Sequence, residues 1–215
     1  MKNIEANKNL INLNGKVKEL PVLSYSYHGE KIYEMIISVK RFSDTYDDLV
    51  VMFSERLLNA SELKIDSIIN VTGELRTYNI VNKSKSKLKL VAFSKEISVV
   101  NENENKNCAE FEGYICKTPI YRTTPLGREI CDVIVAVNRK YYSSKSNKNV
   151  IKSSYIPIIA WSSNAKFLSD LKIGDKISCI GRLQSRKYNK VEDDITTEKI
   201  AYEISLSKVK KIEEE

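Results

Sequence analysis

The chain has 215 residues, which exceeds the usual size of one domain and falls short of three, so we expect two hydrophobic cores. Hydrophobic residues make up 42% of the sequence, and no apolar run approaches the roughly 18 residues of a membrane span. The start of the chain carries no apolar stretch typical of a signal peptide, which favours a cytoplasmic protein that contacts no membrane.

The net charge of +7 favours a polyanionic partner, and its distribution is uneven. Residues 1–104 hold 15 Lys and Arg against 14 Asp and Glu, whereas residues 105–215 hold 20 against 14. The second half therefore carries most of the positive field.

Few residues of the chain could support catalysis or bind a metal. Cys108, Cys116, Cys131 and Cys179 form no CxxC pair, and His28 has no companion at zinc-site spacing. We therefore expect the cysteines to fill the cores, with no metal site and no cofactor.

An enzymatic alternative, a nuclease on a barrel fold, would need a carboxylate cluster with a metal or a histidine acid–base pair. The acidic segment 44–48 lacks the Gly and Glu of a calcium loop, so we expect it only to solvate its loop. No catalytic residue is predicted, and an enzyme is disfavoured.

The sequence contains an internal repeat, which its rare residues reveal. Gly15, Pro21 and Gly29 recur as Gly113, Pro119 and Gly127, each displaced by 98 positions, and Gly73 recurs as Gly181, displaced by 108. The change of offset places an insertion in the second copy near residues 141–154, which we expect to be a long loop. Residues 101–108 are polar and linker-like, so we expect domains at 1–100 and 109–212.

Each copy shows the same order of predicted elements along the chain. In the first copy we expect a long strand before Gly29, strands at 31–41 and 48–53, a helix at 54–63, and strands at 67–76 and 87–99. In the second copy we expect a strand before Gly127, strands at 130–139 and 155–161, a helix at 162–171, and strands at 176–186 and 197–210. This order predicts an all-β protein of two tandem five-stranded OB-fold barrels, each with a short helix between strands 3 and 4.

Aromatic and basic side chains gather on one predicted face of the second barrel. Alternation along strand 155–161 turns Tyr155, Ile159 and Trp161 outward, and strand 176–186 adds Arg182 and Arg186 to the same face. Aromatic rings can stack on bases while basic side chains follow the phosphates, although exposed rings can equally be packed under a loop or a neighbouring subunit.

Residues 111–210 resemble the bacterial single-stranded DNA-binding protein family. The resemblance rests on Gly113-Tyr-Ile, on Val135-Ala-Val-Asn-Arg139, on the segment Tyr155–Lys166, and above all on Ile173–Tyr188 with its Gly181-Arg-Leu. It implies sequence-independent binding of single-stranded DNA in replication, recombination or repair, with bases stacked on Tyr141, Tyr155, Trp161 and Tyr188. Family members usually assemble four barrels, which implies a homodimer here. The sequence ends Lys210-Lys-Ile-Glu-Glu-Glu215 without an acidic-hydrophobic tip, so we do not expect recruitment of other proteins through such a tip.

The first copy resembles the family less, since Glu74 stands where the second copy has Arg182. We expect it to bind strands more weakly, or to serve a structural or dimer-forming role instead. The predicted nucleic-acid-binding residues are Tyr141, Tyr155, Trp161, Tyr188, Arg139, Arg182, Arg186 and Lys187 in the second copy, and Phe53, Tyr78, Arg76, Lys40 and Arg41 in the first. A barrel that docks a protein of a replication or primosome assembly, with little DNA affinity of its own, remains the alternative.

Overall fold

The computed structural model describes residues 8–82, 85–143, 147–192 and 195–213. Its first half holds β1 (Asn9–Tyr27), β2 (Glu30–Lys40), β3 (Tyr46–Ser54), the 3₁₀ helix η1 (Ala60–Glu62), β4 (Ile68–Asn82) and β5 (Lys85–Val100). Its second half holds β6 (Asn107–Ile115), β7 (Ile120–Thr123), β8 (Glu129–Ser143), β9 (Lys148–Trp161), α1 (Ser162–Ser169), β10 (Lys176–Glu192) and β11 (Ile195–Ile212). The prediction of an all-β protein is confirmed.

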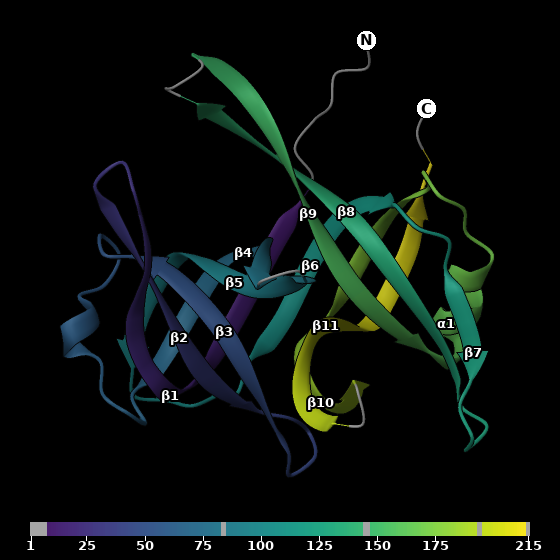
Figure 1. Ribbon diagram of the computed structural model, residues 1–215, viewed down its shortest axis with the longest axis horizontal. Coiled ribbons are helices and arrows are strands. Elements are labelled where there is room, and N and C mark those ends of the chain that lie inside the picture. Colours follow the sequence, from purple (N-terminus) through teal and green to yellow (C-terminus); the bar gives the residue numbers. More distant parts are fainter. Residues whose placement is uncertain (1–7, 83–84, 144–146, 193–194, 214–215) are drawn as a thin grey trace.

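The strand pairings close on themselves once in each half. In the first half the pairing order β1-β2-β3-β5-β4 returns to β1, and in the second half the order β6-β8-β9-β11-β10 returns to β6. Antiparallel pairing of β1 with β6 joins both circuits into one 11-stranded sheet across the described part of the chain. The two halves therefore lie side by side in Figure 1, the first in purple and blue and the second in teal to yellow.

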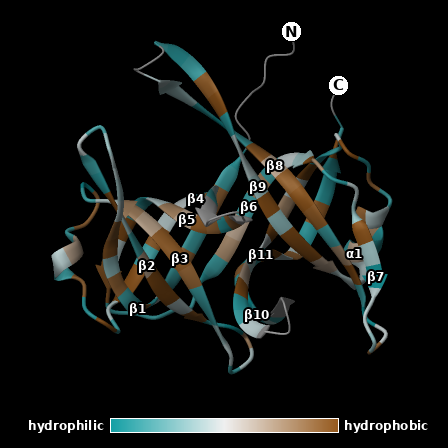
Figure 2. Ribbon diagram, viewed as in Figure 1, coloured by the Kyte–Doolittle hydropathy of each residue, from teal (hydrophilic) through white to brown (hydrophobic). Residues whose placement is uncertain are grey.

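Alternation of apolar and polar residues explains why these segments form strands with one buried face. Along β8 the residues Cys131, Val133, Val135 and Val137 are buried while their neighbours are more exposed, which is the period-2 pattern of a sheet with a single apolar face. Hydropathy alternates along the strands of both halves in Figure 2. Cys131 and Cys179 are fully buried, as expected, and burial raises the pKa of Cys131 to about 11 and that of Cys179 to about 12.

Gly73 stands where β4 and β5 approach too closely for a side chain. A Cβ there would lie 2.1 Å from the backbone oxygen of Phe93, at a register shift between the two strands. We expect Gly73→Ala to lower the free energy of unfolding by about 1–3 kcal/mol, because the backbone must move to admit the methyl group. Urea denaturation followed by circular dichroism measures this. A midpoint equal to that of the unaltered protein would show that the strands can separate without cost.

The two predicted helices differ in outcome. Residues 162–169 form α1, which buries Ala165 and Leu168 against the second half. The helix expected at 54–63 is wrong, since that segment holds only the three-residue η1. Asn59 explains the difference, because its side chain accepts hydrogen bonds from the Ser61 backbone N–H and hydroxyl and so competes with a longer helix.

The long loop expected at 141–154 is also wrong, because most of this segment belongs to two paired strands. Tyr142 of β8 lies opposite Asn149 of β9, and the pairing continues to Ser143 and Lys148. Tyr141, Tyr142, Val150 and Ile151 are residue types that favour strands, which accounts for the hairpin. In Figure 1 the β8–β9 hairpin projects from the second half.

Candidate nucleic-acid interface

Three of the four aromatic residues singled out in the second half are accessible. Tyr155 is 49% exposed, and Tyr141 and Trp161 are each 38% exposed. Tyr188 is half-buried, with the guanidinium of Arg186 lying 6.0 Å from its ring centroid. Ile159, expected beside them on the outer face, is 4% exposed and lies next to Ser205 of β11.

The basic residues of the second half are more constrained than their sequence suggests. Arg186 donates to the buried carboxylate of Glu203, 3.1 Å from Nε, and this hydrogen bond is the main cause that raises the pKa of Arg186. Lys187 pairs with Glu198 at 2.9 Å while remaining exposed. Both keep accessible surface, so phosphate contact is compatible with their positions.

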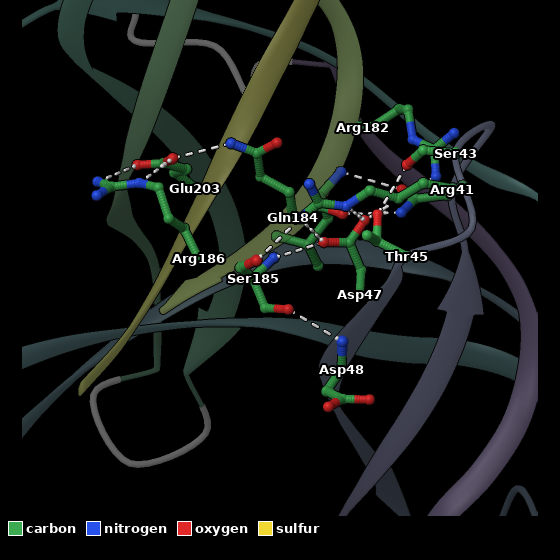
Figure 3. Close-up of polar contacts among 12 residues, drawn as sticks. Arg41, Ser43, Thr45, Asp47, Asp48, Arg182, Gln184, Ser185, Arg186 and Glu203 are labelled. Carbon is green, nitrogen blue, oxygen red and sulfur yellow. Dashed lines mark hydrogen bonds and ion pairs between the residues drawn. The ribbon is translucent and has the colours of Figure 1, made fainter. Parts of the chain in front are cut away.

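Arg182 and Arg41 instead form part of a junction between the halves, which we call the Asp47 junction (Arg41, Asp47, Arg182 and Ser185). Asp47 is completely buried and accepts from Arg41 Nε at 3.0 Å, from Arg41 Nη2 at 2.6 Å and from the Ser185 backbone N–H at 2.9 Å. Arg182 Nη2 lies 4.0 Å from the same carboxylate (Figure 3). The expectation that Asp47 is merely solvated is therefore wrong.

This arrangement gives two arginines a structural role that the sequence did not predict. Arg41 and Arg182 each point to the other half, where Arg41 donates to the Ser185 carbonyl and Arg182 to the Lys40 carbonyl. Their charge is largely committed to holding the halves together, since an ion pair with a buried carboxylate limits what remains for phosphate. Lys40 is half-buried near this junction and pairs with exposed Asp44 at 3.1 Å.

The prediction that Phe53 stacks on bases is wrong. Its side chain is fully buried in the hydrophobic core and stacks on Tyr33 at a centroid distance of 5.9 Å. The repeat alignment places it over Trp161, but Trp161 directly precedes α1 at an exposed position, whereas Phe53 belongs to a strand whose last six residues are all buried.

The other first-half candidates, Arg76 and Tyr78, lie in a groove between the halves that we call the junction groove. The groove has a volume of ≈ 580 Å³. It is lined by Tyr25, Tyr27, Glu30, Ile32, Arg76, Tyr78 and Phe93 from the first half and by Arg139, Tyr141 and Lys152 from the second. Five aromatic rings and three cations thus meet in one open depression.

Residues of the two halves contact each other at the junction groove. Lys152 Nζ lies 5.9 Å from the Tyr78 ring centroid, and the Tyr155 backbone N–H donates to Thr77 Oγ1 at 2.9 Å. Within the first half, burial and then a hydrogen bond with Tyr78 raise the pKa of Tyr25, so the Tyr25 phenol stays neutral. A cationic, ring-lined surface of this kind is suited to unpaired nucleotides.

Glu74 forms the floor of a second contact between the halves, the Glu74 junction (Glu74, Arg76, Lys95 and Arg139). Glu74 is 4% exposed. Its carboxylate accepts hydrogen bonds from Arg76 Nε at 2.6 Å and from Arg139 Nη1 at 2.9 Å, and it forms an ion pair with Lys95 Nζ at 3.1 Å. Burial raises the pKa of Glu74, but the charge and hydrogen bond of Arg76 and those of Lys95 outweigh it, so the pKa is lowered. Glu74 is therefore ionised and neutralised by three cations.

The sequence argument missed Tyr25, Tyr27, Phe93 and Lys152. Tyr25 and Tyr27 alternate along the end of β1, and this spacing is the one signal that could have singled out the pair. Phe93 and Lys152 carry no such signal, because only the packing of one half against the other brings them together.

Two further observations bound the chemistry of the described chain. In the described ranges, no three His, Cys, Asp or Glu side chains lie close enough to hold a metal ion. Neither of the described helices has the length and apolar character that a membrane crossing needs.

Comparisons with solved structures agree with the overall fold. The wild-type single-stranded DNA-binding protein from Thermus aquaticus has a similar structure, with a TM-score of 0.75 and 18% identity over 98% of this chain and 96% of that chain. A deletion mutant of the Thermus aquaticus protein gives a TM-score of 0.71 at 18% identity, covering 99% of this chain and 98% of that one. No curated protein sequence matches the chain. The model of the single-strand binding protein family matches residues 107–212, the segment in which the sequence resembles that family.

Proposed function

We propose that the protein binds single-stranded DNA without sequence preference, in replication, recombination or repair. The observation that carries the proposal is the junction groove, in which rings and cations from both halves line one surface. Bases would stack on the rings, and the cations beside them would meet the phosphates. The exposed rings of Tyr155 and Trp161 and the cations Arg186 and Lys187 extend the interface over the second half.

Fluorescence of Trp161 tests this proposal directly, because it is the one tryptophan of the sequence and it is accessible. We expect oligo(dT) to quench this fluorescence. The logarithm of the binding constant should fall linearly with the logarithm of the salt concentration, because phosphate contacts release counterions bound to the DNA. An unchanged spectrum, together with no retention of DNA on a filter, would contradict the proposal and favour a barrel that docks a protein.

We propose further that each closed circuit of strands is one OB barrel, with domains at 1–100 and 109–212 and the link at 101–108. The link is held at a defined position rather than passing freely between the halves. The side chain of buried Asn14 donates to the Glu102 carbonyl at 3.1 Å and accepts from the Asn105 backbone N–H at 3.0 Å. These bonds support a fixed geometry for the pair of barrels.

A homodimer of four barrels is the assembly we propose. The distal part of β1 exposes Leu20, Val22 and Leu23, which are 47%, 63% and 54% exposed, and adjacent apolar side chains of this kind favour a subunit contact. Light scattering on the eluted protein measures the mass in solution. A mass equal to that of one chain would refute the dimer.

A further inference from the structure

The Glu74 and Asp47 junctions occupy equivalent places in the repeat. Arg41 corresponds to Arg139 at the offset of 98 positions, and Glu74 corresponds to Arg182 at the offset of 108. At the Asp47 junction both members, Arg41 and Arg182, are cations, and the buried Asp47 joins them. At the Glu74 junction the carboxylate is itself one of the two members and pairs directly with Arg139. Glu74 thus takes the place of a basic residue and supplies the negative charge that this junction needs.

A carboxylate beside a DNA-binding groove would ordinarily repel phosphate, and its position relative to the groove argues for another role. Arg76 and Arg139 both line the junction groove and both donate to Glu74. Glu74 is absent from the lining, because it lies beneath the two arginines and is almost entirely buried. Its charge is therefore screened from a strand in the groove by the cations that it holds.

Both arginines lie against aromatic rings of the groove while bound to Glu74. The Arg76 guanidinium carbon is 3.4 Å from the Phe93 ring centroid, and that of Arg139 is 5.4 Å from the Tyr141 centroid. Each guanidinium has five N–H donors, and the bond to Glu74 uses one nitrogen of each. A guanidinium held at one nitrogen and supported on a ring loses little entropy when it binds a phosphate.

We propose that Glu74 is a positioning residue for DNA binding, which fixes Arg76 and Arg139, from opposite halves, at the phosphate path of the junction groove. The inference rests on the proposed function. It predicts a change in DNA affinity opposite to the one that simple electrostatics predicts. Removing a negative charge near DNA should strengthen binding if charge alone matters. Removing it from Glu74 should weaken binding, because the two guanidinium groups lose their common anchor.

Two substitutions separate positioning from charge. Glu74→Gln removes the charge at nearly constant shape, and Glu74→Asp keeps the charge but withdraws the carboxylate by one methylene. We expect both to weaken binding of oligo(dT), by about tenfold for Glu74→Gln, and to reduce the slope of affinity against salt, since a phosphate contact is lost. Thermal unfolding of each variant establishes that the protein tested is folded, and Glu74→Asp serves the test if Glu74→Gln does not fold.

Glu110→Gln provides the matched control. Glu110 pairs with Lys8 and lies outside the junction groove. The same loss of charge there should leave binding unchanged. In a background of Arg139→Met, Glu74→Gln should have a smaller effect than in the unaltered protein, because one of the two positioned groups is already gone.

The outcomes distinguish this inference from the function on which it rests. Failure of the unaltered protein to bind oligo(dT) would overturn the proposed function and the inference with it. Normal binding by the unaltered protein, combined with equal or tighter binding by Glu74→Gln and Glu74→Asp, would overturn the positioning role alone.

Discussion

Replacing Asp47 with alanine is expected to lower the free energy of unfolding by about 3–5 kcal/mol, the usual cost of breaking a buried ion pair by removing one partner. Asp47 is completely buried and accepts two hydrogen bonds from Arg41 and one from the Ser185 backbone. The substitution leaves Arg41 and the Ser185 N–H without their acceptor between the halves. Urea denaturation followed by circular dichroism gives the free energy change.

Asp44→Ala is the control for this substitution. Asp44 is fully exposed and pairs with Lys40 at the end of β2, so its removal should leave the urea midpoint nearly unchanged. If Asp47→Ala and Asp44→Ala unfold at the same urea concentration, the Asp47 junction contributes nothing to stability and the halves are held together elsewhere.

Replacing Tyr78 or Tyr141 with alanine is expected to weaken binding of oligo(dT) by about 1–3 kcal/mol in each case, the range found for removing one ring that stacks on a base. The two rings come from different halves and line the same junction groove. A strand lying in the groove should therefore contact both. Titration of Trp161 fluorescence at constant salt measures the affinity, and the salt slope should not change, because neither ring contacts phosphate.

Tyr46→Ala provides the comparison, since Tyr46 is also an exposed tyrosine but lies at the start of β3, outside the junction groove. We expect it to bind DNA as the unaltered protein does. A loss of affinity for Tyr141→Ala without any loss for Tyr78→Ala would mean that the second half binds DNA by itself and that the first half is structural.

The secondary structure followed from local patterns wherever one pattern dominated. The repeated glycines and the period-2 runs located most strands, because alternation of apolar residues directly reflects one buried face. The segment 54–63 was misjudged because hydrogen bonds that the Asn59 side chain accepts from Ser61 compete locally with a longer helix. The segment 141–154 was misjudged because its polar composition resembles a loop, although its tyrosines and β-branched residues favour paired strands.

The candidate site was predicted less completely than the strands. Tyr141, Tyr155 and Trp161 are accessible where the repeat and the family resemblance placed them. Phe53 failed because an aligned position need not keep its environment, and here the strand that carries it is buried. The identity of an aromatic residue does not reveal whether a neighbouring element covers it.

By itself the sequence determined the duplication, the strand order within each copy and the basic, aromatic character of the second half, because all three depend only on local residue spacing and composition. The tertiary structure alone decided how the copies face each other. The ion pairs of Glu74 with Arg139 and of Asp47 with Arg182 join residues of different halves, whose mutual distance depends on β1 pairing with β6. Arginines that look like phosphate contacts along the chain pair with buried carboxylates in the fold. Electrostatic interaction depends on separation in space and on burial, and neither is a property of one residue's neighbours in sequence.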